Sequence, residues 1–367
     1  MLIFKLNKRV LLFLAIALPI FGFSIEGRAM ATSKEVVEKI LHMPDNRYFG
    51  DPTDFSDLED ALLDSEFYGI ALNGPADVSM DVHRAIPLLL ALKETGIRGW
   101  EVTENKNSVL AATDTHSRVV YIGSIFREPP GKTPMPNIKP PPKPTGASAN
   151  SEIAGVNLID ARNLLTLPNE PALYRFTAIN FDWKSNTVST EITSSKRPTP
   201  QKKPMALTAT SAATQNGLPT WLGETPASTT LQGNPPAAAL HIDVGTPPAP
   251  RVKVVGAVTV FADAALVAQR PYMMDEVGGV KKKVVAHIPA TVAVFIKNST
   301  HPFRQDMVIP VYGETSVKTG DILTGHFTVD LLPDGKPLLP AGEYVAYLFV
   351  EGQTFGPERF ELLPAPK

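Results

Sequence analysis

Two proline-rich stretches divide this chain and limit what each part can fold into. Residues 129–144 hold eight prolines in sixteen positions, and residues 194–250 hold ten prolines among Thr, Ser, Ala, Gln and Asn. Proline fixes φ and lacks a backbone N–H, so neither stretch suits a helix or a central strand. We therefore expect a Pro-rich linker over residues 127–150 and a largely disordered low-complexity segment over residues 194–250, with Trp221 and Leu222 as its apolar anchors.

Residues 1–31 have the layout of a secretory signal peptide. A basic head at residues 5–9 precedes an apolar run at residues 10–23, and Ala29-Met30-Ala31 supplies small residues at the spacing that a signal peptidase accepts. The apolar run is shorter than the roughly 20 residues of a membrane-spanning helix. We expect an exported protein that begins near Thr32 and works in a periplasm, at the cell surface or outside the cell, with no integral membrane span after cleavage.

Composition excludes several classes of chemistry. The chain contains no cysteine, so it has no thiol nucleophile, redox pair or thiolate metal site. Residues 1–31 carry four basic residues and one acidic residue, which leaves 31 basic and 36 acidic residues and a net charge of −5. A nucleic-acid partner is not expected, because phosphate binding needs a basic surface. The basic cluster Lys281-Lys282-Lys283 follows Gly278-Gly279 and is interpreted as a solvated hairpin tip.

The pattern of residues 32–126 predicts a small α+β domain. Apolar residues recur at helical spacing after Ser33 and again after Thr53 or Ser56, either of which is a candidate helix cap. Residues 79–94 are nearly all apolar in their second half, and we expect a third, buried helix there. Three short strands separated by turn residues are expected to follow, at 99–102, 108–112 and 118–122.

Residues 151–193 form a β segment between the two proline-rich stretches. Strand patterns occur at residues 172–181 and 187–192. Two strands alone are marginally stable in water. We therefore expect this segment to pair with the sheet of the C-terminal domain.

Residues 251–364 carry the clearest fold signal. Residues 326–331 alternate between polar and apolar, as in a strand with one wet face, and this alternation places His326 in solvent. The turn at residues 340–344 places Tyr344 at the start of a strand. We expect this tyrosine to have a structural role as a corner. About seven strands in this length predict an immunoglobulin-like antiparallel sandwich. The strands are expected at 252–261, 283–288, 291–297, 307–312, 323–331, 344–351 and 358–362.

The predicted architecture is thus an α+β N-terminal module plus an all-β C-terminal immunoglobulin-like sandwich, joined by Pro-rich linkers. Residues 344–350 are apolar on both faces of their predicted strand. We expect a central strand, covered by the sandwich partner on one side and by the middle segment or the N-terminal module on the other. The alternative is an exposed apolar strip that binds a partner.

No catalytic residue, cofactor or metal site is predicted. The seven histidines show no metal-ligand spacing, and the sequence has no nucleophile elbow, H-E-x-x-H pair or phosphate loop. The acidic residues between 51 and 64 lack the spacing of a calcium loop, and a role at a positive helix end explains them better. Asp275 and Glu276 lack a visible partner base and are interpreted as loop residues.

These observations favour a non-enzymatic binding or assembly protein of the cell envelope or surface, with the sandwich as its contact platform and a protein or envelope component as its partner. The alternative is an extracytoplasmic hydrolase that uses carboxylates and carries the sandwich as an accessory domain. Candidate contact segments are residues 271–276, 298–305 and 352–358. The predicted partner-binding residues within them are Tyr272, Met273, His301, Phe303, Arg304 and Phe355.

Overall fold

The protein is mostly β-structure, in several antiparallel sheets with short helices. A computed structural model describes residues 33–43, 48–49, 55–96, 108–125, 145–146, 150–181, 183–195, 234–245, 252–269, 274–277, 280–297, 302–313, 315–331 and 339–363. The expected signal peptide and most of the Pro-rich linker lie outside these residues. Within them, no helix has the length and apolar character to cross a bilayer.

Residues 33–195 form the first of two β units, here called the N-terminal unit. Its two sheets have the strand orders β1-β3-β6 and β2-β9-β7-β4-β5, with β8 paired to β7. All pairs are antiparallel except β2 with β9. The elements are α1 (Ser33–Lys39), α3 (Ser56–Leu63), β1 (Gly69–Asn73), β2 (Asp77–Ser79), β3 (Pro87–Thr95), β4 (Ser108–Asp114), β5 (Val120–Ser124), β6 (Glu152–Asp160), α5 (Ala161–Leu165), β7 (Ala172–Asn180), β8 (Trp183–Lys184) and β9 (Val188–Thr193).

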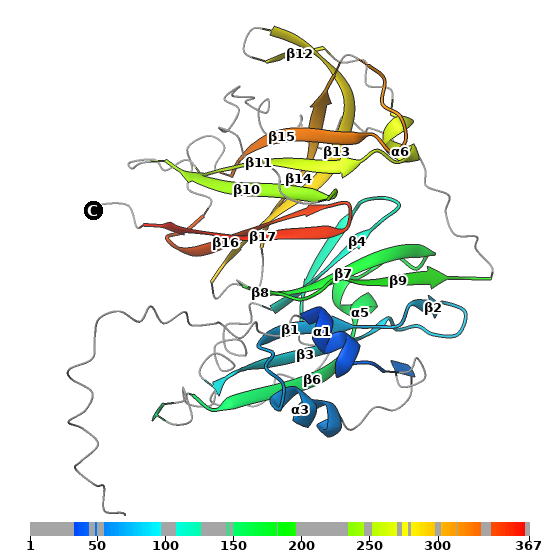
Figure 1. Ribbon diagram of the computed structural model, residues 1–367, viewed down its shortest axis with the longest axis vertical. Helices are drawn as coiled ribbons and strands as arrows, with labels where there is room; N and C mark the ends of the chain where they lie inside the picture. The colour runs from blue at the N-terminus through cyan, green and yellow to red at the C-terminus, as the bar shows by residue number, and fades with distance from the viewer. Residues whose placement is uncertain are drawn as a thin grey trace, which may run out of the picture.

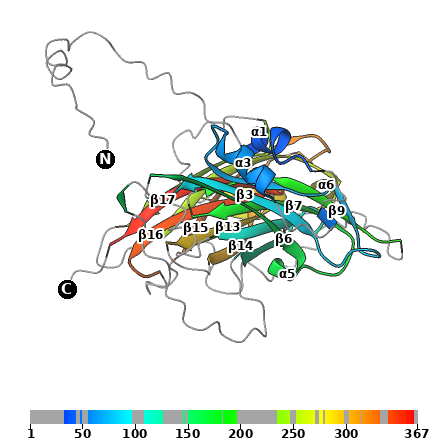
Figure 2. The same cartoon turned by 90° about the horizontal axis from the view of Figure 1, so that it is seen from below.

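The β1-β3-β6 sheet lies between two apolar layers. One layer, which includes Leu88 and Phe176, packs it against the larger sheet of the same unit. The other layer, which includes Leu62 and Leu89, packs it against α1 and α3. Figure 2 shows these two helices lying over the strands.

The prediction of a buried helix at residues 79–94 is wrong, because the apolar part of this run forms the central strand β3 and residues 80–86 lead into it without helical structure. Leu88 and Leu89 are both fully buried, although neighbouring side chains on a strand point to opposite faces. Each belongs to a different apolar layer. A strand covered on both faces needs a continuous apolar run, and such a run resembles a buried helix.

The expected pairing of residues 151–193 with the C-terminal sheet is also wrong. Strand β6 pairs along its whole length with β3, and β7 pairs with β4. The segment therefore completes both sheets of the N-terminal unit. Four expected elements, α1, α3, β4 and β5, lie close to their predicted positions, and residues 99–102 fall outside the described ranges.

Residues 234–363 form the second β unit, the C-terminal unit, which is an antiparallel β-sandwich. One sheet has the order β10-β11-β15; in the other, β13 pairs with β12, β14 and β16, and β16 pairs with β17. Its core lies between these sheets. The elements are β10 (Ala237–Val244), β11 (Val252–Phe261), α6 (Ala264–Val267), β12 (Met274–Val277), β13 (Val280–Ile296), β14 (Phe303–Tyr312), β15 (Ile322–Asp330), β16 (Gly342–Val350) and β17 (Gln353–Leu362).

The strand predictions for residues 251–364 are confirmed in kind, with two corrections. Residues 283–288 and 291–297 belong to one long strand, β13, and not to two. Residues 237–244, placed in the low-complexity segment, form strand β10, which pairs with β11 over its whole length. The side chains of Leu240 and Ile242, on the inner side of this strand, contact the core, and their burial explains why a strand forms here.

Strand β16 lies between the two units and confirms the prediction of a strand covered on both sides. Its even-numbered residues, such as Leu348, contact the C-terminal core. Its odd-numbered residues, such as Tyr347, face β4 and β7 of the N-terminal unit. The four sheets therefore stack as consecutive layers, with β16 and β17 against β4 and β7 in the middle of the stack (Figure 1).

Tyr344 forms the expected corner. Its hydroxyl donates to the carbonyl oxygen of Pro340, four residues upstream, and its ring stacks on Phe360 with centroids 5.0 Å apart. His326 is exposed on β15, as the alternation predicts. The backbones of residues 281 and 282 pair with those of residues 276 and 275 next to the turn between β12 and β13, which confirms the hairpin.

Candidate functional site: the polar junction between the two units

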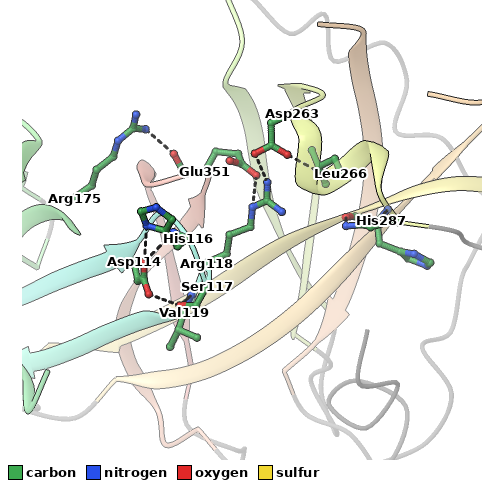
Figure 3. Close-up of polar contacts among 11 residues, drawn as sticks. Asp114, His116, Ser117, Arg118, Val119, Arg175, Asp263, Leu266, His287 and Glu351 are labelled. Atoms are coloured by element: carbon green, nitrogen blue, oxygen red, sulfur yellow. Dashed lines mark hydrogen bonds and ion pairs between the residues drawn. The ribbon is translucent and has the colours of Figure 1, made fainter. Parts of the chain in front are cut away.

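Arg118 of the N-terminal unit reaches into the C-terminal unit and contacts two carboxylates there. Its Nη2 donates to Oδ2 of Asp263 at 2.9 Å, and its Nε lies 2.9 Å from Oε1 of Glu351 (Figure 3). The Arg118 side chain is 5% exposed, whereas those of Asp263 and Glu351 are 25% and 23% exposed. A nearly buried guanidinium is tolerated because two anions neutralise it.

The turn between β4 and β5 positions Arg118. Asp114 accepts from the backbone N–H of His116 at 2.8 Å and from the hydroxyl of Ser117 at 2.6 Å. The N–H of Arg118 donates to the Asp114 carbonyl at 2.7 Å. Arg118 has a φ of 60°, which β-carbon-bearing residues seldom adopt. The predicted turn chemistry at 114–116 thus aims the Arg118 side chain at the other unit.

The turn between β16 and β17 positions Glu351. Val350 pairs with Gln353, so Glu351 and Gly352 form a two-residue hairpin turn. Their φ values of 49° and 72° are those of a type I′ turn, whose twist matches that of the strands. Arg175 of β7 holds this turn from the opposite unit, since its Nη1 donates to the Glu351 carbonyl at 2.7 Å.

Asp263 has two roles at once. It is the N-cap of α6, where its Oδ1 accepts from the N–H of Leu266 at 2.9 Å. Its Oδ2 accepts from Arg118. Behind α6, the Gln269 side chain exchanges two hydrogen bonds with the backbone of His287 on β13, at 2.8 and 3.1 Å. The chain just after α6 is thereby tied to a central strand, at the opposite end of this short helix from Asp263.

A second set of contacts crosses between the units beside the apolar layer. The Tyr347 hydroxyl donates to the carbonyl of Phe181 at 2.7 Å, and Lys184 Nζ donates to the carbonyl of Thr354 at 2.6 Å. The hydroxyls of Thr354 and Thr177, both buried, lie 3.3 Å apart. Partial desolvation lowers the pKa of Lys184. The apolar layer itself consists of Val109, Ala111, Val120 and Ile179 against Ala293, Phe295, Val345, Tyr347 and Phe349.

The chemistry of this junction is that of ion pairing and not of proton relay. His116 Nδ1 lies 3.8 Å from Oδ1 of Asp114, beyond hydrogen-bond length. Ser117 donates to Asp114 and not to a histidine. The arrangement fixes the orientation of the two units, since each charged side chain is held by a turn or a helix cap of its own.

The predicted partner-binding residues lie elsewhere, on the strands and loops of the C-terminal unit. Phe303 and Arg304 were assigned to a loop at 298–305, but they begin strand β14. Phe303 packs against the C-terminal core, and the Arg304 side chain, 34% exposed, pairs with Asp306 at 2.8 Å. Tyr272, Met273 and His301 lie outside the described residues.

The segments 271–276 and 352–358 are likewise not simple loops. Residues 274–276 belong to β12, and residues 353–358 belong to β17. Phe355 of β17 is partly buried against the C-terminal core. Because strand pairing continues through these positions, the described candidates are strand residues, and Arg304 alone among them combines exposure with charge.

Tyr121 of β5 has a pKa shifted by its surroundings. Burial raises the pKa of Tyr121 on β5, as do the carboxylates of Asp114 and Glu170, whereas the charge of Arg304 lowers it. Tyr121 also contacts Tyr174 edge to face, with ring centroids 6.2 Å apart.

The acidic residues of the 51–64 stretch that the structure describes serve α3. Its N-cap position is Phe55, without a side-chain cap, so neither predicted cap residue is seen in that role. Asp57 and Glu59 lie in the first turn, and Oε1 of Glu59 accepts from the N–H of Val156 at 3.0 Å. No group of three or more metal-ligating side chains occurs among the described residues.

Sequence reasoning missed the three residues at the centre of the junction. The available signals were local: Asp263 precedes an apolar Ala-Ala-Leu-Val run as a helix cap does, and Glu351-Gly352 is a two-residue turn between β patterns. Neither signal predicts which side chain Asp263 or Glu351 contacts. No family model matches this chain, and no curated protein is significantly similar to it.

Proposed function

We propose that this chain is an exported, non-enzymatic binding or assembly protein of the cell envelope or surface. Its C-terminal unit is an immunoglobulin-like sandwich that serves as the contact platform. The layout of residues 1–31 supports export, and the Tyr344 corner together with the antiparallel sandwich supports the immunoglobulin-like assignment.

One observation carries this proposal: the two units are joined through a buried layer and not only through the chain. Apolar side chains of β4 and β7 pack on those of β13 and β16 in the manner of a protein core, and the Arg118 ion pairs lie at one side of this layer. A scaffold joined in this way holds its outer strands and turns at fixed positions. Recognition by loops and strand surfaces depends on such rigidity.

The outer sheet of the C-terminal unit offers a specific contact point. Phe261 and Ile322 are paired across β11 and β15 and are 50% and 61% exposed. They lie on the face of the sheet that points away from the core, at the end of the two strands. An exposed aromatic and aliphatic pair on a rigid strand is a common anchor for a protein partner.

The hydrolase alternative requires a carboxylate within hydrogen-bond reach of a second carboxylate or of a histidine. Two carboxylate–histidine pairs approach this arrangement, Asp114 with His116 at 3.8 Å and Glu358 with His241 at 3.7 Å. The first lies within a tight turn, and His241 in the second is 76% exposed. Neither geometry favours acid–base catalysis over the binding function.

The test is affinity capture with residues 32–367, from the envelope and secreted fractions of the source cells, read by mass spectrometry. We expect a stoichiometric protein or envelope component. The double variant Phe261→Ser and Ile322→Ser should reduce its recovery at least tenfold. Val82→Ser is the matched control, because Val82 is an exposed apolar residue (72%) in the N-terminal unit. Recovery of a turned-over small molecule instead of a partner would contradict the proposal.

A further inference from the structure

The N-terminal unit is built from residues 33–195 and the C-terminal unit from residues 234–363. Among the described residues, the contacts between the units therefore join residues before 196 to residues after 233, and residues 196–233 connect the two units in the sequence. We propose that the N-terminal unit of one copy also packs on the C-terminal unit of a second copy, through this same surface. The inference rests on the proposed assembly function and names a second copy of this chain as a partner.

The connection is long enough for such an exchange. Residues 196–233 comprise 38 positions. At 3.3–3.6 Å per residue, their extended reach is about 130 Å. The mean end-to-end distance of a random chain of this length is about 35 Å. Both distances allow the N-terminal unit of one copy to pack on the C-terminal unit of another.

The apolar faces of the two units are complementary to each other. If the units separate, the N-terminal unit presents Val109, Ala111 and Ile179, and the C-terminal unit presents Val345, Tyr347 and Phe349. Such an apolar face is costly in water unless a matching face covers it. A second copy carries the exact complement, including carboxylates at the places where Arg118 needs them.

Charge complementarity restricts the partner further. The N-terminal unit contributes three cations to the junction: Arg118, Arg175 and Lys184. In the C-terminal unit they contact the carboxylates of Asp263 and Glu351 and the backbone carbonyls of Glu351 and Thr354. Two N-terminal faces would therefore place like charges together. The exchange must pair unlike units, which gives a closed dimer or an open chain of copies.

Three residues with a left-handed backbone lie at the surface, each in a turn of its own unit. Arg118, Phe181 and Glu351 have φ values of 60°, 44° and 49°, in the left-handed region that β-carbon-bearing residues avoid. All three take part in contacts between the units, since the carbonyls of Phe181 and Glu351 accept hydrogen bonds across the junction. Each of these turns lies within one unit, so each unit presents the same surface to its own partner unit and to that of a second copy.

Concentration decides which pairing is populated. A connection of this length gives the two units of one copy an effective concentration on the order of 1 mM for each other. Pairing within one copy therefore prevails in dilute solution. Pairing between copies becomes comparable where the local concentration approaches about 1 mM, as it does in an assembly on a surface.

Cysteine exchange tests this inference, because the natural chain contains no cysteine. The hydroxyls of Thr177 and Thr354 lie 3.3 Å apart across the junction, so cysteines at these positions bring their sulfur atoms close together. One chain carries Thr177→Cys and the other carries Thr354→Cys. The two are mixed, unfolded and refolded together at about 1 mM or about 10 μM, and oxidised with oxidised glutathione.

We expect a disulfide-linked heterodimer whose yield is at least tenfold higher at the greater concentration. The double variant Thr177→Cys and Thr354→Cys in one chain should cross-link internally at the lower concentration. A chain with Thr324→Cys, exposed on β15, replaces the Thr354→Cys chain as the control for random collisions. Internal cross-linking without a heterodimer above this control would overturn the exchange, and absence of both products would overturn the surface itself.

The failure of this inference is distinguishable from that of the proposed function. Capture uses the cysteine-free chain and reports any partner. A captured protein of another sequence, together with no heterodimer, would overturn the exchange and leave the binding function standing. A heterodimer with nothing but this chain captured would support the exchange and restrict the assembly to copies of this chain.

Discussion

Tyr347 of the C-terminal unit donates its hydroxyl to the carbonyl of Phe181 in the N-terminal unit at 2.7 Å. Tyr347 is fully buried, and its ring lies edge to face with Phe295, at a centroid distance of 5.8 Å. Phe181 has a left-handed backbone, with a φ of 44°. A single tyrosine thus packs the apolar layer between the units and also satisfies a carbonyl in a strained turn.

Tyr347→Phe should lower the free energy of unfolding by about 1–3 kcal/mol, because it leaves the Phe181 carbonyl without this donor while keeping the ring. Urea denaturation followed by tryptophan fluorescence measures the change. Tyr121→Phe serves as a control, since the Tyr121 ring lies on β5 at the rim of the larger sheet and is only half-buried. Equal stability of Tyr347→Phe and the natural chain would show that the hydrogen bond across the junction contributes nothing.

Arg118→Met should lower the free energy of unfolding by about 3 kcal/mol, since it removes the cation that neutralises the partly buried carboxylates of Asp263 and Glu351. Arg304→Met is the matched control, because Arg304 also forms an ion pair with an aspartate, but in a pair that is 34% and 53% exposed. Exposed pairs contribute less than about 1 kcal/mol. If the two variants lose the same stability in urea denaturation, the Arg118 pairs have no special role in joining the units.

Gly352→Ala should destabilise the protein more than Gly320→Ala. Both glycines have positive φ, 72° and 91°, so an alanine is strained at either position. A Cβ on Gly352 would lie 2.5 Å from Cδ of Arg175, whereas a Cβ on Gly320 would meet nothing within 4 Å. Arg175 can move away only by weakening its hydrogen bond to the Glu351 carbonyl.

We expect a loss of about 1 kcal/mol for Gly320→Ala and about 2–3 kcal/mol for Gly352→Ala. Thermal unfolding of both variants measures the difference. The comparison isolates the close approach of the two units, because the backbone strain is common to both positions. Indistinguishable melting temperatures would mean that Arg175 does not hold this turn.

The sequence predicted the C-terminal unit better than the N-terminal unit, for a physical reason. Strand β15 alternates exposed His326 with buried Phe327, a period of two that only a half-buried strand produces. Strand β3 has Leu88 and Leu89 buried on opposite faces, so its period is lost. Such a run indicates burial and leaves open whether the burial is that of a helix or a strand.

The polar junction could not be predicted because its partners are distant in the chain. Arg118 and Asp263 are 145 positions apart, and each lies in a locally ordinary setting, a turn and a helix cap. The contact between this turn and this helix cap depends on how the two complete units stack. The sequence did indicate the apolar half of this contact, since Tyr344–Val350 needs cover on both faces.

The Tyr344 corner should make stability depend on pH above 10. Burial raises the pKa of Tyr344 from its ordinary value of 10.0 to about 12. Its hydroxyl is a donor to the Pro340 carbonyl, a role that the phenolate cannot fill. The stabilisation is fully present below pH 10, where both states are protonated. It is lost as the pH rises from about 10 to about 12, because the unfolded chain deprotonates first.

Tyr344→Phe removes this titration and the hydrogen bond to Pro340 together. We expect the variant to be less stable than the natural chain by about 1 kcal/mol at pH 7. Its stability should fall less steeply between pH 10 and pH 12, so that the two urea midpoints converge. Parallel decline of both proteins over this range would contradict a raised pKa for Tyr344 and would assign the alkaline loss to other groups. Burial also raises the pKa of Tyr174 on β7, whose Phe variant should repeat the pattern in the N-terminal unit.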